Sequence, residues 1–167
     1  MTKPEHLRTL ARSNRWANRR LYAACRALND DAYRADRGAF FGSIHRTLNH
    51  ILVGDRAWLG RLEGIDRGIR SLDQILYDDL PTLTDARTRE DVRIIAFVDG
   101  LDPERLEEPL VYRTIAGEAQ ETAIGLVVLH MINHATHPRG QIHCMLSQIP
   151  TDPPPLDLIY FLREQSE

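Results

Sequence analysis

Histidine is the residue type of this chain best suited to chemistry, and four of its seven histidines fall between residues 130 and 143. An α-helix turns about 100° per residue, so His130, His134 and His137 would lie within roughly 60° of one another on one helix face. His143 would point to the opposite side. Imidazoles at i and i+4 can bind one transition metal ion. The spacing therefore predicts a candidate metal site that still needs a ligand from another element.

Two more histidines, His45 and His50, lie in a second segment with helical periodicity. They are five residues apart, so at most one of them can face the interior of a helical bundle. Asp55 lies closer to the middle of the apolar face of the same segment. A carboxylate on an apolar face needs a partner. We therefore expect Asp55 to pair with an arginine of another helix, with orientation of a metal ligand as the alternative.

Four long segments with apolar residues at helical spacing must position these side chains. The first is expected to have its N-cap at Thr2 and to stop at 29–31, and the others cover 44–64, about 84–98 and about 122–149. Helical spacing is weak over 72–80. A short hairpin or extended crossover is expected within 101–121, and residues 156–162 are expected to pack back on the body. The pattern predicts an all-α fold, a single domain over 1–167 arranged as an up-down four-helix bundle with a long crossover before the last helix.

The composition excludes several classes of protein. Charged residues make up 27% and hydrophobic residues 43% of the chain, as in an ordinary soluble domain. A formal net charge of -3 argues against a nucleic-acid binder, although nearly all of the basic residues are arginines. No apolar run is long enough to cross a membrane, and the N-terminus does not resemble a signal peptide. Cys25 and Cys144 lack CxxC spacing, so we expect two reduced, buried cysteines and a cytoplasmic protein.

Several segments of the sequence together resemble the DinB family, nearly from end to end. The most specific is Asn133–Gln141, which reads NHATHPRGQ. Supporting segments are WANRRL at Trp16–Leu21, TLNHIL at Thr47–Leu52, and Asp55–Arg56 with Trp58. The resemblance implies a four-helix bundle that is usually a homodimer. It also implies a divalent metal ion, nickel or zinc, held by three histidines.

The ligands implied by the resemblance match this sequence at two positions, His50 in the second helix and His134 in the last. The third position is Pro138 here. Proline has no metal-binding atom and lacks the N–H that would bond to the His134 carbonyl, so we expect a kink or bulge at this point. A rotated His137 would complete a set of His50, His134 and His137. His130 is the alternative third ligand, and a metal-free site is the remaining possibility.

The resemblance implies a metal-dependent transferase or isomerase that uses a low-molecular-weight thiol such as bacillithiol, mycothiol or glutathione on a small electrophile. The change at Pro138 keeps a second hypothesis open, in which a stress-associated bundle binds a small molecule with neither metal nor catalysis. DNA contact is suggested only by the family name, and the acidic balance argues against it. Arg139 points away from the histidine face on an ideal helix, so a structural or dimer role stays open beside substrate binding.

Overall fold

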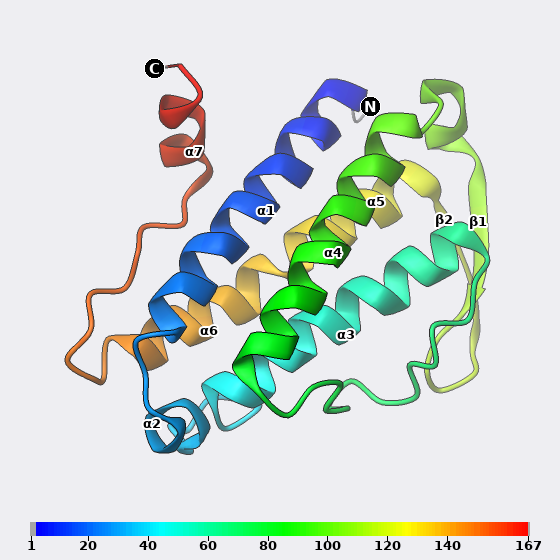
Figure 1. Cartoon of the computed structure of the whole chain (residues 1–167). Helices are drawn as coiled ribbons and strands as arrows, with labels where there is room; N and C mark the ends of the chain where they lie inside the picture. Colours follow the sequence, from blue (N-terminus) through cyan, green and yellow to red (C-terminus); the bar gives the residue numbers. More distant parts are fainter. Residues whose placement is uncertain (1–2, 167) are drawn as a thin grey trace.

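The computed structural model describes residues 3–166, which form a mostly helical structure with a small two-stranded sheet (Figure 1). In chain order the elements are α1 (Pro4–Cys25), α2 (Asp30–Arg34), α3 (Ile44–Glu63), α4 (Leu80–Gly100), the 3-10 helix η1 (Pro103–Glu107), β1 (Pro109–Arg113), β2 (Ala119–Ala123), α5 (Ile124–His134), α6 (Thr136–Leu146) and α7 (Leu158–Glu164). Helix α1 packs on α4 and α5, and α3 packs on α4, α5 and α6. The histidines of α3 are therefore brought against those of the last two long helices.

Local sequence sets the ends of α1 and α3. Pro4 lies in the first turn of α1, where its missing N–H is not needed, and the predicted cap Thr2 lies outside the described residues. The Ser43 side chain caps α3 by accepting a hydrogen bond from the N–H of Arg46. Gly64 ends α3 in the left-handed conformation, at φ 69°, which glycine adopts without strain.

Two boundaries differ from the prediction. Helix α4 begins at Leu80 rather than near Thr84, because the Asp79 side chain accepts a hydrogen bond from the N–H of Thr82 and caps the helix there. Residues 72–79, over which the helical periodicity was weak, form turns and loop up to that cap, and Pro81 lies in the first turn of α4. The predicted stop at 29–31 is the start of α2, whose first turn is capped by the side chain of Asn29.

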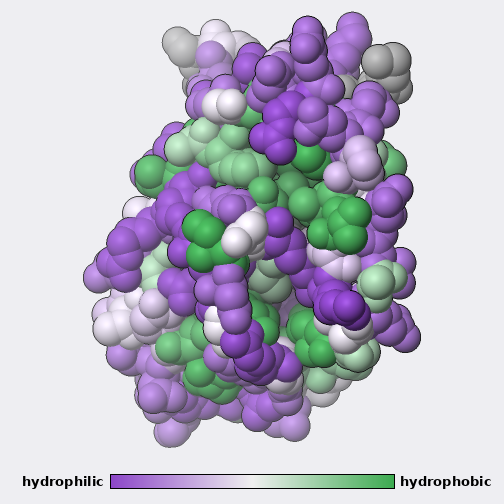
Figure 2. Space-filling view, turned by 90° about the vertical axis from the view of Figure 1, so that its right-hand side faces the viewer, coloured by the Kyte–Doolittle hydropathy of each residue, from purple (hydrophilic) through white to green (hydrophobic). Residues whose placement is uncertain are grey.

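The predicted hairpin is confirmed between η1 and α5. Strands β1 and β2 pair antiparallel, with Val111 opposite Glu121. They lie at the right-hand edge of the molecule in Figure 1, and Figure 2 shows this side, on which hydrophobic residues lie among hydrophilic ones. Val111 is 70% exposed. The hairpin therefore lies on the outside of the helices and leaves the buried core to them.

The last long helix is interrupted, as Pro138 predicted. Helix α5 ends at His134 and α6 begins at Thr136, with Ala135 between them. Pro138 has no N–H to donate to the carbonyl of His134. The helical bonding resumes one residue later, where the N–H of Arg139 donates to the carbonyl of Ala135 at 3.1 Å.

Buried apolar side chains form two clusters at different levels of the helices. One cluster lies where α3 meets α6 and contains Leu21, Ile44, Leu48, Leu52 and Ile142; the other lies where α3 meets α5 and contains Leu7, Leu59, Ile94, Val128 and Met131. Between them lie six buried polar residues, which we call the polar layer: Asn14 and Asn18 of α1, Asp55 of α3, Arg87 and Asp91 of α4, and Arg139 of α6. Buried polar side chains from α1, α3, α4 and α6 thus separate the two apolar clusters of the core.

The polar layer is held by ion pairs and amide bonds. Arg87 pairs with Asp55 at 2.5 Å and with Asp91 at 3.0 Å. Asn18 donates to Asp91 at 2.9 Å, and Arg139 donates to the side-chain oxygens of Asn18 and of Asn14. The expected pairing of Asp55 with an arginine of another helix is therefore confirmed, and Arg139 has a structural role.

The C-terminal segment packs back on the body, as predicted. In Figure 1 it returns along the outside of the molecule and places α7 beside α1. The rings of Trp16 and Phe161 lie 6.0 Å apart, and the indole N–H of Trp16 donates to Glu164 at 2.6 Å. Within residues 3–166, no helix combines the length and the apolar character needed to cross a membrane.

Candidate functional site

His50 lies in the middle of α3 and is buried, with 5% of its surface exposed. Its Nδ1 atom lies 2.8 Å from the backbone oxygen of Leu72. A carbonyl oxygen only accepts hydrogen bonds, so Nδ1 carries the proton and the neutral ring keeps its lone pair on Nε2. Metal-binding histidines are commonly oriented by such a bond from the other ring nitrogen. The ring is thus held in a form in which Nε2 is able to bind a ligand.

His134 is the last residue of α5, and its ring rests against α3 at Gly54. A Cβ atom at Gly54 would lie 3.2 Å from Cε1 and 3.3 Å from Nδ1 of His134. This contact is tighter than most side chains accept, so glycine at this position lets the ring approach α3. The ring centroids of His50 and His134 lie 5.3 Å apart. The structure therefore brings together the two histidines that match the family ligands.

Both imidazoles are neutral at pH 7. Burial, and after it the nearby imidazoles of His50, His130 and His137, lower the pKa of His134 to about 4. Burial also lowers the pKa of His50, against the hydrogen bond to Leu72, which raises it. Neutral imidazole is the form that binds metal ions and accepts protons.

The third position is not filled in the same way. Pro138 is buried, whereas His137 is exposed and its Nε2 lies 3.3 Å from the amide nitrogen of Gln141. His130 is exposed as well, with its ring 5.7 Å from that of His134. Over residues 3–166, no three or more His, Cys, Asp or Glu side chains are grouped so as to hold a metal ion. The structure therefore brings together two members of the predicted set, His50 and His134. A metal site with His137 as the third ligand stays a prediction.

Aromatic side chains surround the histidine pair. Phe41, from the loop before α3, stacks on His50 with the ring centroids 3.9 Å apart. Trp58 lies edge-on to His130 at 4.9 Å, and the guanidinium of Arg61 lies 4.4 Å from the Trp58 ring centroid. Sequence reasoning did not find Phe41. Its only signal was the Phe40–Phe41 pair, which comes two residues before the Ser43 cap, close to the position from which a hydrophobic residue often packs on the helix that follows.

The remaining histidines and the cysteines lie outside this site. His45 is buried like His50, but its Nε2 lies 3.1 Å from the backbone oxygen of Tyr77, in the loop before α4, and not beside His134. His6 is exposed and His143 half-buried. Both cysteines are free, and Cys25 is buried as predicted. The prediction that Cys144 is buried is wrong, because it lies on the outer face of α6.

The chain is similar to known proteins both in sequence and in fold. The sequence model of the DinB family matches residues 1–167. The chain therefore belongs to the DinB family. Protein DinB of Bacillus subtilis (strain 168) is 25% identical over 141 residues, which make up 81% of each protein.

A solved DinB-like protein from Bacillus cereus ATCC 10987 has the same fold, with a TM-score of 0.64. The match covers 83% of this chain and 89% of that one, at 16% sequence identity. His50 and His134, the two positions at which the resemblance implies ligands, lie together in this fold. Pro138 stands at the third such position.

Proposed function

We propose that this DinB-family protein is a four-helix bundle that holds a divalent transition metal ion, nickel or zinc, on His50 and His134. The proposal rests on the hydrogen bond from Nδ1 of His50 to the Leu72 carbonyl, which leaves the Nε2 lone pair of a buried, neutral ring free, and on the His134 ring, whose centroid lies 5.3 Å away. A third ligand is required for a stable site with an open coordination position. His137 is exposed, so its side chain is free to turn toward the pair.

The proposed reaction joins a low-molecular-weight thiol to a small electrophile. A metal ion with an open position supplies a thiolate at neutral pH, because it lowers the pKa of a bound thiol. The chain contributes the apolar ring of Phe41 on one side of the histidine pair and the stacked Trp58 and Arg61 beyond His130. Arg61 forms no ion pair within the part of the chain that is described, and its guanidinium is suited to a carboxylate of the thiol or the electrophile. We further propose a homodimer that acts in the cytoplasm.

Metal binding is the first test. The protein is purified without a nickel column and without chelators, its metal content is measured by mass spectrometry, and Ni²⁺ and Zn²⁺ are titrated by calorimetry. We expect one ion per chain. Removal of even an orienting partner costs a metal site 10- to 100-fold in affinity, so His50→Ala and His134→Ala should each weaken binding by at least about tenfold.

The same titration identifies the third ligand. His137→Ala should weaken binding as His134→Ala does, while His6→Ala, an exposed histidine on α1, is the matched control. If His130→Ala weakens binding and His137→Ala does not, His130 is the third ligand. An unaltered affinity in His134→Ala would refute the site.

A metal-free binder is the second candidate function, and the observation that favours it is the absence of a three-ligand group within residues 3–166. In this case the aromatic side chains around the histidine pair bind a small molecule without catalysis. Protein that contains no metal and binds neither Ni²⁺ nor Zn²⁺ would support this candidate and exclude the first. Thiol consumption with an electrophile such as monochlorobimane, measured with and without added metal, separates the two independently.

A further inference from the structure

A second cavity, of about 690 Å³, lies along the seam of α1 and α4 and contains none of the histidines. The end of α7 closes it through Glu164. Four of its lining residues are arginines: Arg19 and Arg20 of α1, Arg26 at the C-cap of α1, and Arg87 of α4. Arg20 pairs with Glu164 at 2.9 Å and Arg87 with Asp91 at 3.0 Å, whereas Arg19 and Arg26 form no ion pair among the residues the structure describes. The four arginines face two carboxylates, so the lining of the cavity carries a net positive charge.

Buried hydrogen-bond donors without partners line the same cavity. They are the hydroxyl of Tyr22, Nε of Arg20 and Nε of Arg87. Tyr22 and Arg87 are each 2% exposed. Burial raises the pKa of Tyr22 well above its ordinary value, so the hydroxyl keeps its proton and donates. A buried donor without an acceptor costs about 1 to 3 kcal/mol. Several such donors around one charged cavity indicate a ligand that supplies acceptor atoms.

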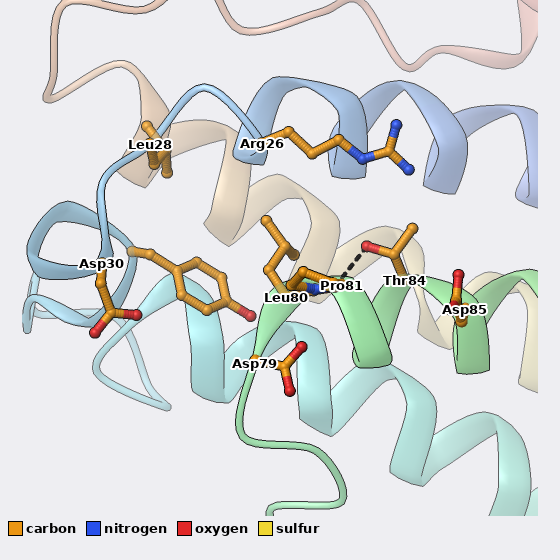
Figure 3. A pocket seen from close by; sticks show the side chains of 9 residues that line it. Arg26, Leu28, Asp30, Asp79, Leu80, Pro81, Thr84 and Asp85 are labelled. Atoms are coloured by element: carbon orange, nitrogen blue, oxygen red, sulfur yellow. Dashed lines mark hydrogen bonds between the residues drawn. The ribbon is translucent and has the colours of Figure 1, made fainter.

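A neighbouring cavity of about 480 Å³ continues this groove toward α2 and shares Arg26 and Thr84 with the first (Figure 3). Leu28, Leu80 and Pro81 give it an apolar wall. The hydroxyl of Tyr33, another buried donor without a partner, lines it as well.

Charges of both signs line the groove. Figure 3 shows the Arg26 side chain extended along α1, away from Leu28 and from Asp30 near α2. Asp85 lies on α4 beyond Thr84, on the side toward which the Arg26 guanidinium extends. The arginines gather in the larger cavity, where they attract a negative head group, while Asp30 and Asp79 repel it from the α2 end. An apolar body then faces Leu80 and Pro81.

We propose that the α1–α4 groove binds a small amphipathic organic anion. Its carboxylate or phosphate head accepts hydrogen bonds from Tyr22 and Arg87 and pairs with Arg19 and Arg26. Its apolar body lies in the cavity lined by Leu28, Leu80 and Pro81. This site shares no residue with the histidine pair, so it does not depend on the proposed metal chemistry.

Calorimetric titration of the full-length protein with four probes tests the proposal. Octanoate and octyl phosphate carry both parts of the ligand, inorganic phosphate carries only the head, and octanol carries only the body. We expect octanoate and octyl phosphate to bind at least tenfold more tightly than octanol and than inorganic phosphate. The tighter of the two identifies the head group. Equal affinity for octanoate and octanol would overturn the proposal, and so would the absence of binding.

Matched variants locate the site. Arg19→Ala combined with Arg26→Ala should weaken octanoate binding at least tenfold, whereas Arg15→Ala with Arg89→Ala removes two exposed arginines from the same helices outside the groove and should leave it unchanged. Tyr22→Phe should weaken binding severalfold while the protein stays folded, because its hydroxyl has no partner to lose. If the control pair weakens octanoate binding as much as the groove pair does, the loss reflects the removal of positive charge anywhere on the protein, and the proposed site is refuted.

Discussion

The polar layer makes a strong prediction about Arg87. Its side chain is 2% exposed and lies 2.5 Å from Asp55 and 3.0 Å from Asp91, both of which are equally buried. Replacement by methionine keeps much of the volume but leaves two buried carboxylates without the guanidinium that pairs with them. Removal of one partner from a buried ion pair costs about 3 to 5 kcal/mol. Domains of this size have a total free energy of unfolding of about 5 to 15 kcal/mol, so Arg87→Met should lose a large part of it.

The pH dependence of this loss distinguishes charge from packing. Burial raises the pKa of Asp55 to about 6 in the folded protein, against the opposing charge of Arg87. Without Arg87 this pKa rises further, so the folded variant keeps Asp55 protonated at pH values where the unfolded chain is ionised. A raised folded-state pKa favours folding at low pH, and this contribution is lost as the pH rises through it. The variant should therefore lose less stability at pH 5 than at pH 8.

Urea denaturation followed by circular dichroism at 222 nm measures both effects. Arg89→Met, an exposed arginine on the same helix, is the control and should change the unfolding free energy by less than about 0.5 kcal/mol. The triple variant Asp55→Asn, Arg87→Met, Asp91→Asn removes all three charges and should recover part of the loss. A loss below about 1 kcal/mol in Arg87→Met, or a loss independent of pH, would refute the role assigned to the layer.

Three further predictions follow from single residues. Gly60→Ala should destabilise the protein by about 1 to 3 kcal/mol in urea denaturation, since a Cβ there would lie 2.7 Å from a backbone oxygen of the loop after α3. Pro138→His supplies the missing ligand four residues after His134 and should raise Ni²⁺ affinity at least about tenfold in calorimetry; unchanged affinity would show that the helix break, not the ligand, limits the site. Burial raises the pKa of Cys25 to about 12 while Cys144 is exposed, so Ellman's reagent at pH 8 should titrate one thiol in the native protein and two in urea.

The parts of the structure that were predictable are those encoded by local sequence. The periodicity of α3 and the i, i+4 spacing identified the helices that carry His50 and His134, and the missing N–H of Pro138 predicted the interruption between α5 and α6. The parts that were missed depend on contacts between distant segments. Nothing near Leu72 in the sequence indicates that its carbonyl orients His50, because 22 residues separate the two.

The polar layer was predictable in part, because some of its residues carry a signal in the local sequence. Asp55 was identified because a carboxylate on an apolar helix face has to find a partner. Arg87 carries the same signal, since it lies among the buried Leu83, Ala86 and Ile94 of α4. The helix expected over about 84–98 already contained Arg87, Ala86 and Ile94, so this signal was present in the sequence and was not used. The partner of Asp55 was therefore predicted by type, an arginine of another helix, and not by residue.

Pro138 interrupts the last long helix without separating its two parts. It stands where the resemblance implies the third ligand, and α5 ends four residues before it, at His134. The interruption is short, because Ala135 keeps a helical conformation and the helical bonding resumes with the N–H of Arg139. Arg139 lies in the polar layer, bonded to Asn14 and Asn18 of α1. The helix therefore keeps its contact with α1, and a metal ion held by His50 and His134 alone would have fewer protein ligands and more open positions than the resemblance implies.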